Sequence, residues 1–374
     1  MSAYYIGLMS GTSLDGVDGV MVHDDGGSFR VVHHACAPFS VALARELLAL
    51  NTTGADELQR CARCANQVVL IYASVVAELL TRTGLAGGMI TAVGAHGQTV
   101  RHQPQGAHGV PGYTIQLNNP ALLAELTGID VVADFRSRDV AAGGQGAPLV
   151  PAFHQAVFGS PHEAIAVLNI GGISNISLIG PTTTTDSPLR GFDCGPGNAL
   201  MDHWCQLHTG QRFDRDGAWA ASGQVHEGLL AALLDDPYFS NPPPKSTGRD
   251  LFNPRWLDQK LEPFSHLQPV SVQATLTALT AQCCALDLTL FGSGSKKLIV
   301  CGGGALNNCL MRALRSRLPG MSIESSEMSG LPPLQVEAAA FAWLARKTMR
   351  RETSSLPSVT GARGARILGA IYPA

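Results

Sequence analysis

The chain has 374 residues, of which 45% are hydrophobic and 15% are charged, and its formal net charge is −3. This length fits two domains of ordinary size, and the apolar content predicts a packed core rather than a disordered chain. A nearly neutral chain without a long basic run is not expected to bind nucleic acid. Without a basic amphipathic helix it is not expected to bind a membrane surface either.

Targeting and redox features predict a cytoplasmic protein. The first residues lack the basic segment of a signal peptide, and polar residues or glycines interrupt the apolar runs before the about 18 residues that a membrane span needs. The nine cysteines are odd in number and irregularly spaced. This pattern favours free, buried thiols in a reducing compartment, with a metal or redox site at Cys61 and Cys64 as the alternative.

The first half of the chain alternates strand and helix patterns. Three strands come first, and the hairpin sequence Asp24-Asp25-Gly26-Gly27 joins the second to the third. Apolar residues at three- and four-residue steps then predict a long amphipathic helix. The expected elements are strands 4–9, 17–22, 29–36, 90–95, 113–117 and 129–135 and helices 56–83 and 120–128.

The second half begins as the first does, with a strand, a glycine-rich polar turn and another strand. Its expected elements are strands 164–170, 176–179, 190–194 and 297–301 and helices 197–209, 223–235, 271–290, 306–317 and 334–350. The repeated beginning and the alternation of strands with helices predict an α/β protein of two related domains with mixed sheets.

The polar loop between the first two strands is a candidate phosphate site. Its glycines let backbone amides approach a phosphate closely, and its hydroxyls add donors. Asp15 and Asp18 could hold Mg²⁺, which takes carboxylate oxygens as ligands. A plain hairpin turn is the alternative. The candidate residues are Gly11, Thr12, Ser13, Leu14, Asp15, Gly16, Val17 and Asp18.

Two further glycine clusters could bind a nucleotide. The first repeats the loop chemistry in the second half of the chain, where it would hold a polyphosphate from the other side. The second lies between a strand and a helix, where an anion often meets the helix N-terminus. The chain has no Gly-Lys pair and hence no Walker P-loop. The clusters are Gly171, Gly172, Ser174 and Asn175, and Gly302, Gly303 and Gly304.

Asp193 is the candidate general base. It stands between small residues at the end of a strand, which suits a residue that takes a proton from a bound substrate or water. An aspartate that caps the following helix is the alternative.

Several polar residues could contact a substrate. Arg136 could pair with a carboxylate or phosphate, or belong to a solvated cluster of salt bridges. His96, Gln98 and Thr99 follow a strand and could line a sugar site. Glu337 begins a helix, where an acid also favours the helix dipole.

A series of motifs, in order along nearly the whole chain, resembles the anhydro-N-acetylmuramic acid kinase family. Each motif is modest alone, but the set is specific. Leu306 departs from the family pattern, which leads us to expect a histidine there. The motifs are residues 9–18, 94–99, 133–136, 146–151, 169–175, 192–198, 245–249 and 301–304.

The resemblance implies a ribonuclease H-like, actin-like ATPase architecture, in which two mixed five-stranded sheets surround a central nucleotide cleft. The expected division is residues 1–136 with about 349–374, and residues 137–348. The implied reaction converts 1,6-anhydro-N-acetylmuramic acid, ATP and water into N-acetylmuramic acid 6-phosphate and ADP, in peptidoglycan recycling. The resemblance is also compatible with a homodimer.

The resemblance also implies roles for the candidate residues. Asp193 would activate the attacking water. The three glycine-rich segments would hold ATP and Mg²⁺, and the sugar contacts would come from His96, Gln98, Thr99, Arg136 and Glu337.

Three other activities would use the same residues. A sugar kinase of this superfold would use Asp193 to deprotonate a sugar hydroxyl, without hydrolysis. A nucleotide-dependent binding protein of the actin–chaperone type would need a further partner-binding domain or surface. A phosphatase would release inorganic phosphate without a sugar acceptor.

Overall fold

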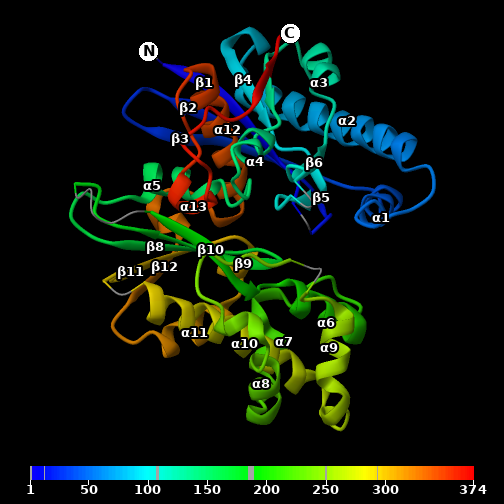
Figure 1. Cartoon of the computed structure of the whole chain (residues 1–374), viewed down its shortest axis with the longest axis vertical. Coiled ribbons are helices and arrows are strands. Elements are labelled where there is room, and N and C mark those ends of the chain that lie inside the picture. The colour runs from blue at the N-terminus through cyan, green and yellow to red at the C-terminus, as the bar shows by residue number, and fades with distance from the viewer. Residues whose placement is uncertain (1, 12, 107–108, 184–188, 249–250, 293) are drawn as a thin grey trace. The chain divides into compact units, whose positions relative to one another are not determined.

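The computed structural model (Figure 1) describes residues 2–11, 13–106, 109–183, 189–248, 251–292 and 294–374. Contacts divide the chain into two compact units, which are unit 1 (Met1–Val157 with Gln335–Ala374) and unit 2 (Phe158–Leu334). The sequence-based division differs at two places. It assigned residues 137–157 and 335–348 to the second domain, whereas their contacts group them with unit 1.

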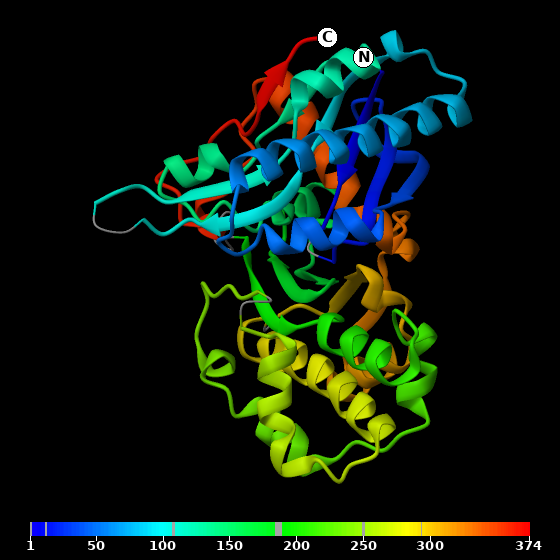
Figure 2. The same cartoon turned by 90° about the vertical axis from the view of Figure 1, so that its right-hand side faces the viewer.

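Unit 1 contains a six-stranded mixed sheet in the order β13-β7-β4-β1-β2-β3. β1, β2 and β3 are antiparallel neighbours, and β1, β4 and β7 run parallel. A separate pair, β5 and β6, forms a ribbon that is cyan in Figure 2. The strands are β1 (Ala3–Met9), β2 (Gly16–Asp24), β3 (Phe29–Pro38), β4 (Ile90–Ala95), β5 (Gln98–Gln103), β6 (Tyr113–Leu117), β7 (Val131–Ala133) and β13 (Ala370–Tyr372).

Helices cover both faces of this sheet. α2 packs against Gly19, and α12 packs against Gly7. Gly7 pairs with Val20 and Gly19 pairs with Leu8, so the two glycines stand at successive register positions and point to opposite faces of the sheet. The helices of unit 1 are α1 (Val41–Ala49), α2 (Glu57–Thr83), α3 (Pro120–Thr127), α4 (Ser137–Ala141), α12 (Val336–Met349) and α13 (Pro357–Thr360), and α5 (Val150–Phe158) ends at the boundary with unit 2.

Glycines allow α12 to approach the sheet very closely. A Cβ atom on Gly7 would lie 1.9 Å from the carbonyl oxygen of Ala338, and one on Gly94 would lie 2.1 Å from that of Phe341. The facing side of α12 is rich in alanine, so backbone packs nearly on backbone. This contact places residues 335–349 with the first unit.

Unit 2 repeats the strand order of unit 1. Its five-stranded sheet runs β10-β9-β8-β11-β12, with β8, β9 and β10 antiparallel and β8, β11 and β12 parallel. In both units the order is third, second, first, fourth and fifth strand, which is the ribonuclease H-like order. The prediction of two related α/β domains is therefore confirmed.

The helices of unit 2 outnumber its strands among the described residues, and the bounds of both follow. The strands are β8 (Ile165–Ile170), β9 (Ile173–Ile179), β10 (Arg190–Pro196), β11 (Lys297–Cys301) and β12 (Ser322–Ser325). The helices are α6 (Ala199–Thr209), α7 (Ala218–Ala221), α8 (Glu227–Leu234), α9 (Pro254–Leu261), α10 (Pro269–Phe291) and α11 (Asn308–Arg317). The short 3-10 turns of the two units are Gly87–Met89, Arg215–Gly217, Pro237–Ser240, Glu262–Phe264, Gly303–Leu306, Ser326–Ser329 and Pro333–Gln335.

Among the described residues, two helices, α2 and α10, are long and apolar enough to cross a membrane by length and composition alone. Core helices of soluble proteins pass the same test. The apolar window of α10 is 72% buried, and α2 buries one face on β2 and β3. We therefore assign both helices to the cores of their units.

Candidate active site

The β10 strand of unit 2 carries Asp193, and three hydrogen bonds fix this residue. Its backbone N–H donates to the carbonyl oxygen of Lys245 at 3.1 Å, and its own carbonyl accepts from the Tyr238 hydroxyl at 2.7 Å. Its carboxylate oxygen Oδ2 accepts from the backbone N–H of Thr247 at 3.0 Å. The carboxylate is thus oriented by backbone rather than by a mobile side chain.

Burial raises the pKa of Asp193 to about 6, although the Thr247 amide and the Lys245 charge act in the opposite direction. A carboxyl group with a pKa in this range is mostly ionised at neutral pH. It is also a stronger base than an exposed aspartate. The electrostatics therefore suit proton transfer.

A row of polar residues crosses the sheet beside Asp193. Asn175 on β9 is the register partner of both Asp193 on β10 and Asn169 on β8. Directly opposed residues of antiparallel strands point to the same face. The row therefore places the Asn175 carboxamide on the strand next to the carboxylate and the Asn169 carboxamide one strand further.

The turn between β8 and β9 directs its amides away from α6. The carbonyl of Ile170 accepts from the Asn198 side chain at 3.0 Å, and that of Gly171 accepts from the Asn198 backbone N–H at 2.7 Å. Carbonyl and amide of a trans peptide point in opposite directions, so the N–H groups of Gly171 and Gly172 face the other way. Such a pair of amides can bind a phosphate oxygen.

Gly302, Gly303 and Gly304 lie against this turn. Cβ atoms on Gly302 and Gly304 would lie 2.5 Å from the Asn169 side chain and 2.4 Å from that of Ile170. The structure therefore brings the second and third predicted glycine clusters together at the carboxyl ends of β8 and β11. Crevices at such ends commonly bind ligands in α/β sheets. Leu306, which follows them, is half-exposed.

Ser174 lies on the opposite face from Asn175 and is fully buried. Its hydroxyl donates to the Gly195 carbonyl at 3.0 Å and accepts from the Cys284 thiol at 3.4 Å. The hydroxyl therefore holds β9 against β10 and α10, inside the core.

In unit 1 the loop after β1 is tied to the segment after β4. Gln98 donates to the Gly11 carbonyl at 3.1 Å, and the Ser10 hydroxyl donates to the Gly97 carbonyl at 3.1 Å. The Tyr72 hydroxyl lies 3.0 Å from Ser10 Oγ and accepts from the Gly97 N–H at 3.0 Å. Burial raises the pKa of Tyr72 to about 12, which keeps this hydroxyl protonated.

The other residues of this loop divide into exposed and packed ones. Ser13 is exposed, and Leu14 takes a left-handed backbone with φ of 58°. Gly16 and Val17 are part of β2, where a Cβ on Gly16 would lie 2.4 Å from the Ala37 carbonyl oxygen. Thr12 lies outside the described residues.

The candidate metal ligands Asp15 and Asp18 have different partners. Asp15 accepts a hydrogen bond from the Ser13 hydroxyl at 2.7 Å, and Asp18 lies 3.1 Å from His34 Nε2. Asp18 keeps 45% of its side chain exposed. No group of three metal-ligating side chains occurs among the described residues. Asp15 and Asp18 could therefore bind Mg²⁺ only if phosphate oxygens of a bound nucleotide and water molecules supply the other ligands. Mg²⁺ is usually held in this way.

Three of the predicted sugar contacts lie together in unit 1. Arg136 Nε donates to His96 Nε2 at 3.0 Å, and Arg136 Nη1 donates to the Gly146 carbonyl at 2.8 Å. Burial lowers the pKa of Arg136 to about 10, opposed by the charges of Glu337 and Asp139. Burial and, next, the Arg136 charge hold the pKa of His96 well below its usual value.

The remaining two, Gln98 and Thr99, lie on β5. Gln98 is buried with its Nε2 on the Gly11 carbonyl, and Thr99 accepts from Gln116 at 3.2 Å. Gln98 therefore supports the loop after β1, and Thr99 supports the pairing of β5 with β6.

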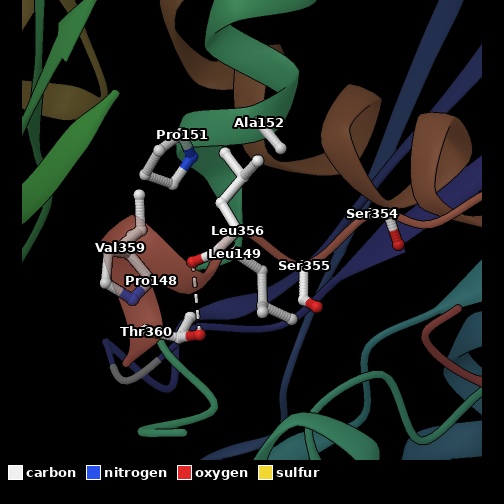
Figure 3. A pocket seen from close by; sticks show the side chains of 9 residues that line it. All are labelled: Pro148, Leu149, Pro151, Ala152, Ser354, Ser355, Leu356, Val359 and Thr360. Atoms are coloured by element: carbon white, nitrogen blue, oxygen red, sulfur yellow. Dashed lines mark hydrogen bonds between the residues drawn. The ribbon is translucent and has the colours of Figure 1, made fainter. Parts of the chain in front are cut away.

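Sequence reasoning missed the buried carboxylate that shapes the Arg136 segment. Asp139 accepts from the Gly146 N–H at 2.8 Å and from the Thr360 hydroxyl at 2.8 Å. Its place within the charged run after β7 was the available signal. Thr360 also borders a small hollow of unit 1 (Figure 3), whose lining residues lie in the segments 148–152 and 354–360 and include none of the candidates.

Comparison with known proteins decides the family. The model of the family described as anhydro-N-acetylmuramic acid kinase matches residues 3–374. The chain belongs to this family. Proteins named anhydro-N-acetylmuramic acid kinase from Albidiferax ferrireducens and Variovorax paradoxus are each 63% identical to it, over 100% and 99% of both chains respectively. One from Cupriavidus pinatubonensis is 55% identical over 99% of this chain and 98% of its own. The expectation that the protein is a kinase of this family is confirmed.

Proposed function

We propose that the protein opens 1,6-anhydro-N-acetylmuramic acid with water and transfers the γ-phosphoryl group of ATP to it. The products are N-acetylmuramic acid 6-phosphate and ADP, in recycling of the cell wall. The observation that carries the proposal is Asp193, a backbone-held carboxylate with a raised pKa in a chain of this kinase family.

Asp193 is the general base of the ring opening. Its ionised carboxylate takes a proton from water as the water oxygen bonds to the anomeric carbon. The bond from that carbon to the bridging oxygen breaks, and the oxygen remains on carbon 6. This oxygen then attacks the γ-phosphorus, and ADP leaves. The protein mainly supplies position and charge in such a transfer.

Asn175 is suited to hold the reacting water or a sugar hydroxyl. It stands one strand away from Asp193 on the same face, and its carboxamide offers both a donor and an acceptor. His96 and Arg136 of unit 1 are proposed sugar contacts, with Gln98, Thr99 and Glu337 around them.

The glycine-rich turns of each unit are proposed to bind the phosphates of ATP through backbone amides. Asp15 and Asp18 offer the carboxylate oxygens that suit Mg²⁺, which would neutralise phosphate charge when bound. Within the described part of the chain, the Asp15 carboxylate accepts a hydrogen bond only from the neighbouring Ser13, which leaves it ligand capacity for this role. We place the reaction in the cytoplasm, where ATP is available and free thiols such as the exposed Cys36 stay reduced.

A coupled assay of ADP formation tests the proposal. ADP should appear only when the anhydro-sugar is present, because the sugar is the phosphoryl acceptor. Phosphate release without sugar would instead identify a phosphatase. Run in ¹⁸O-labelled water, the reaction should place the label at the anomeric position. A phosphorylated sugar without that label would show a kinase that lacks the hydrolytic step.

A further inference from the structure

An ion pair lies in the core of unit 2, next to Asp193. Lys245 Nζ donates to Asp287 Oδ1 at 2.9 Å, and their side chains are only 4% and 2% exposed. Removing two charges from water costs several kcal/mol, and an apolar pair of similar volume is often equally stable. The ion pair is therefore not expected to add much to the free energy of unfolding. Its position near the proposed base suggests a role in the reaction instead.

Lys245 lies at the start of the segment that holds Asp193. The Lys245 carbonyl accepts from the Asp193 N–H at 3.1 Å, and the N–H of Thr247, two residues later, donates to the Asp193 carboxylate at 3.0 Å. The segment thus reaches both the backbone and the side chain of the base.

The Lys245 ammonium also contacts Tyr238, the third hydrogen-bond partner of Asp193. It lies 5.2 Å from the centre of the Tyr238 ring, within the range of a cation–π interaction. The Tyr238 hydroxyl in turn donates to the Asp193 carbonyl at 2.7 Å. The three hydrogen bonds described for Asp193 are therefore made with the Lys245 carbonyl, with the Thr247 N–H two residues later, and with the Tyr238 hydroxyl, whose ring the Lys245 ammonium contacts.

We propose that Lys245 is a positioning residue for the reaction, which is anchored to α10 by Asp287 and in turn fixes the direction of the Asp193 carboxylate. Lys245 does not touch the reacting atoms in this role. The inference rests on the proposed function of Asp193 as the base, and it adds the element that sets its orientation and its charge environment.

The surroundings of Asp193 define the expected pH effect. The titratable groups here are Lys245 and Tyr238 before α9, Asp287, Cys283 and Cys284 on α10, and Cys194 on β10 itself. The Lys245 charge lowers the pKa of Asp193, so its loss should raise that pKa. The acidic limb of the pH profile should then move to higher pH.

The test compares Lys245→Met with the double variant Lys245→Met/Asp287→Leu. The single variant leaves a buried carboxylate without its partner and can fail to fold, whereas the double variant removes both charges and keeps an apolar filling. In the folded double variant we expect kcat to fall about 10–100-fold, because a misplacement of about 1 Å at the reacting groups can cost about 10²-fold. The acidic limb should rise in pH in Lys245→Met and rise less in the double variant, because loss of the Asp287 charge opposes the shift, and the KM for ATP should change by less than about twofold.

Two controls separate this inference from its basis. Lys297→Met removes a lysine from a partly exposed ion pair with Glu324 in the same unit and should leave kcat and the acidic limb unchanged. Asp193→Asn tests the base directly. If Asp193→Asn loses activity while the folded double variant keeps the wild-type kcat and acidic limb, the positioning role is wrong and the base remains. If Asp193→Asn keeps more than about a tenth of the rate, the base assignment itself fails.

Discussion

Arg136 Nε donates a hydrogen bond of 3.0 Å to Nε2 of His96. A nitrogen that accepts a hydrogen bond carries no proton, so the ring proton of a neutral His96 is on Nδ1. Nδ1 is buried, and no hydrogen bond from it occurs among the described residues, although the backbone at Ser10 and Gly97 raises the pKa of His96 against burial and the Arg136 charge. The charge of Glu337 in turn raises the pKa of Arg136.

His96 should remain neutral in mildly acidic solution. Burial and the Arg136 charge hold its pKa well below 6.5, so protonation would occur only far below neutral pH. Nitrogen NMR of histidine-labelled wild type and His96→Asn should identify the His96 ring, which should keep the Nδ1–H form down to about pH 5.5. His102 and His154 should also stay neutral there, because burial lowers their pKa values to about 4 and about 3. If the His96 ring becomes doubly protonated by that pH, the arrangement is different in solution.

Arg136→Gln should reduce kcat/KM for the sugar by about 10–100-fold, because a hydrogen bond to a charged group contributes about 1.5–3 kcal/mol. Steady-state kinetics with varied sugar at saturating ATP measures this loss. An unchanged kcat/KM would remove Arg136 from the proposed sugar site.

The rate should depend on pH through Asp193. The base acts in its ionised form, and its pKa is raised to about 6. kcat/KM should therefore increase with pH up to about 6 and then level off, provided that no other group of the free enzyme titrates there. Asp193→Asn should lower kcat about 10²–10⁴-fold and abolish this limb. A wild-type profile that is flat between pH 4.5 and 7 would contradict the assignment.

Asp193→Asn should also make the protein more stable at neutral pH. The pKa of Asp193 is about 6 in the folded state and 3.8 as the reference, so the folded protein binds the proton more tightly. The ionised carboxylate therefore reduces the free energy of unfolding as pH rises from about 4 to about 6, and the loss persists above that range. Asparagine carries no charge and still offers an oxygen to the Thr247 N–H.

The gain should be about 1 kcal/mol at pH 8, less than the full shift implies because Asp193 is partly exposed. It should shrink toward zero near pH 4, where the wild-type carboxyl is neutral. Urea denaturation of both proteins at pH 5 and pH 8 measures the difference. A variant that is less stable than the wild type at pH 8 would show that the carboxylate is well compensated in the fold.

The sequence predicted the long periodic elements and the segments at strand ends, but not the short elements that depend on distant partners. β5 (Gln98–Gln103) is polar and forms because it pairs with β6, and β12 (Ser322–Ser325) has four residues that pair with β11. Neither carries an apolar alternation of its own. α1 was missed although its signal was present, since Ser40 caps it and Leu43 and Leu47 are one turn apart.

The candidate site shows the same limit. Asp193 could be selected because it stands between small residues near the expected end of a strand, and it lies within β10. Thr247, which fixes its carboxylate, is 54 residues away in the sequence. Such a contact depends on tertiary packing and leaves no local pattern. Gly94, which begins one of the family motifs, serves helix–sheet packing, as Gly7 does.

Gly7→Ala should be severely destabilising. The new methyl group would lie 1.9 Å from the Ala338 carbonyl oxygen, which is backbone and cannot rotate away. β1 and α12 would have to separate, at a cost of at least about 3 kcal/mol. Denaturation by urea should show this loss. Gly88→Ala is the matched control, because a Cβ there has no atom within 4 Å, and its effect should stay within about 1 kcal/mol. Equal stabilities of the two variants would contradict the close packing of α12.

Gly11 and Gly171 differ from Gly7 because neither is needed for packing. A Cβ on Gly11 would have its nearest neighbour at 3.8 Å, and one on Gly171 at 3.7 Å. Gly11→Ala and Gly171→Ala should therefore leave the free energy of unfolding within about 1 kcal/mol of the wild type. If these turns approach the phosphates of ATP, the added methyl groups should raise the KM for ATP by about tenfold, the effect of losing about 1.4 kcal/mol of binding.

The KM for the sugar should change less in both variants, because the added methyl groups would oppose the nucleotide. Initial rates with varied ATP at saturating sugar, and the reverse, separate the two effects. Gly88→Ala again serves as the control for preparation and folding. An unchanged KM for ATP in a stable Gly171→Ala protein would mean that the β8–β9 amides do not contact the nucleotide. The same result for Gly11→Ala would exclude only the β1–β2 loop, so the two turns can be judged separately.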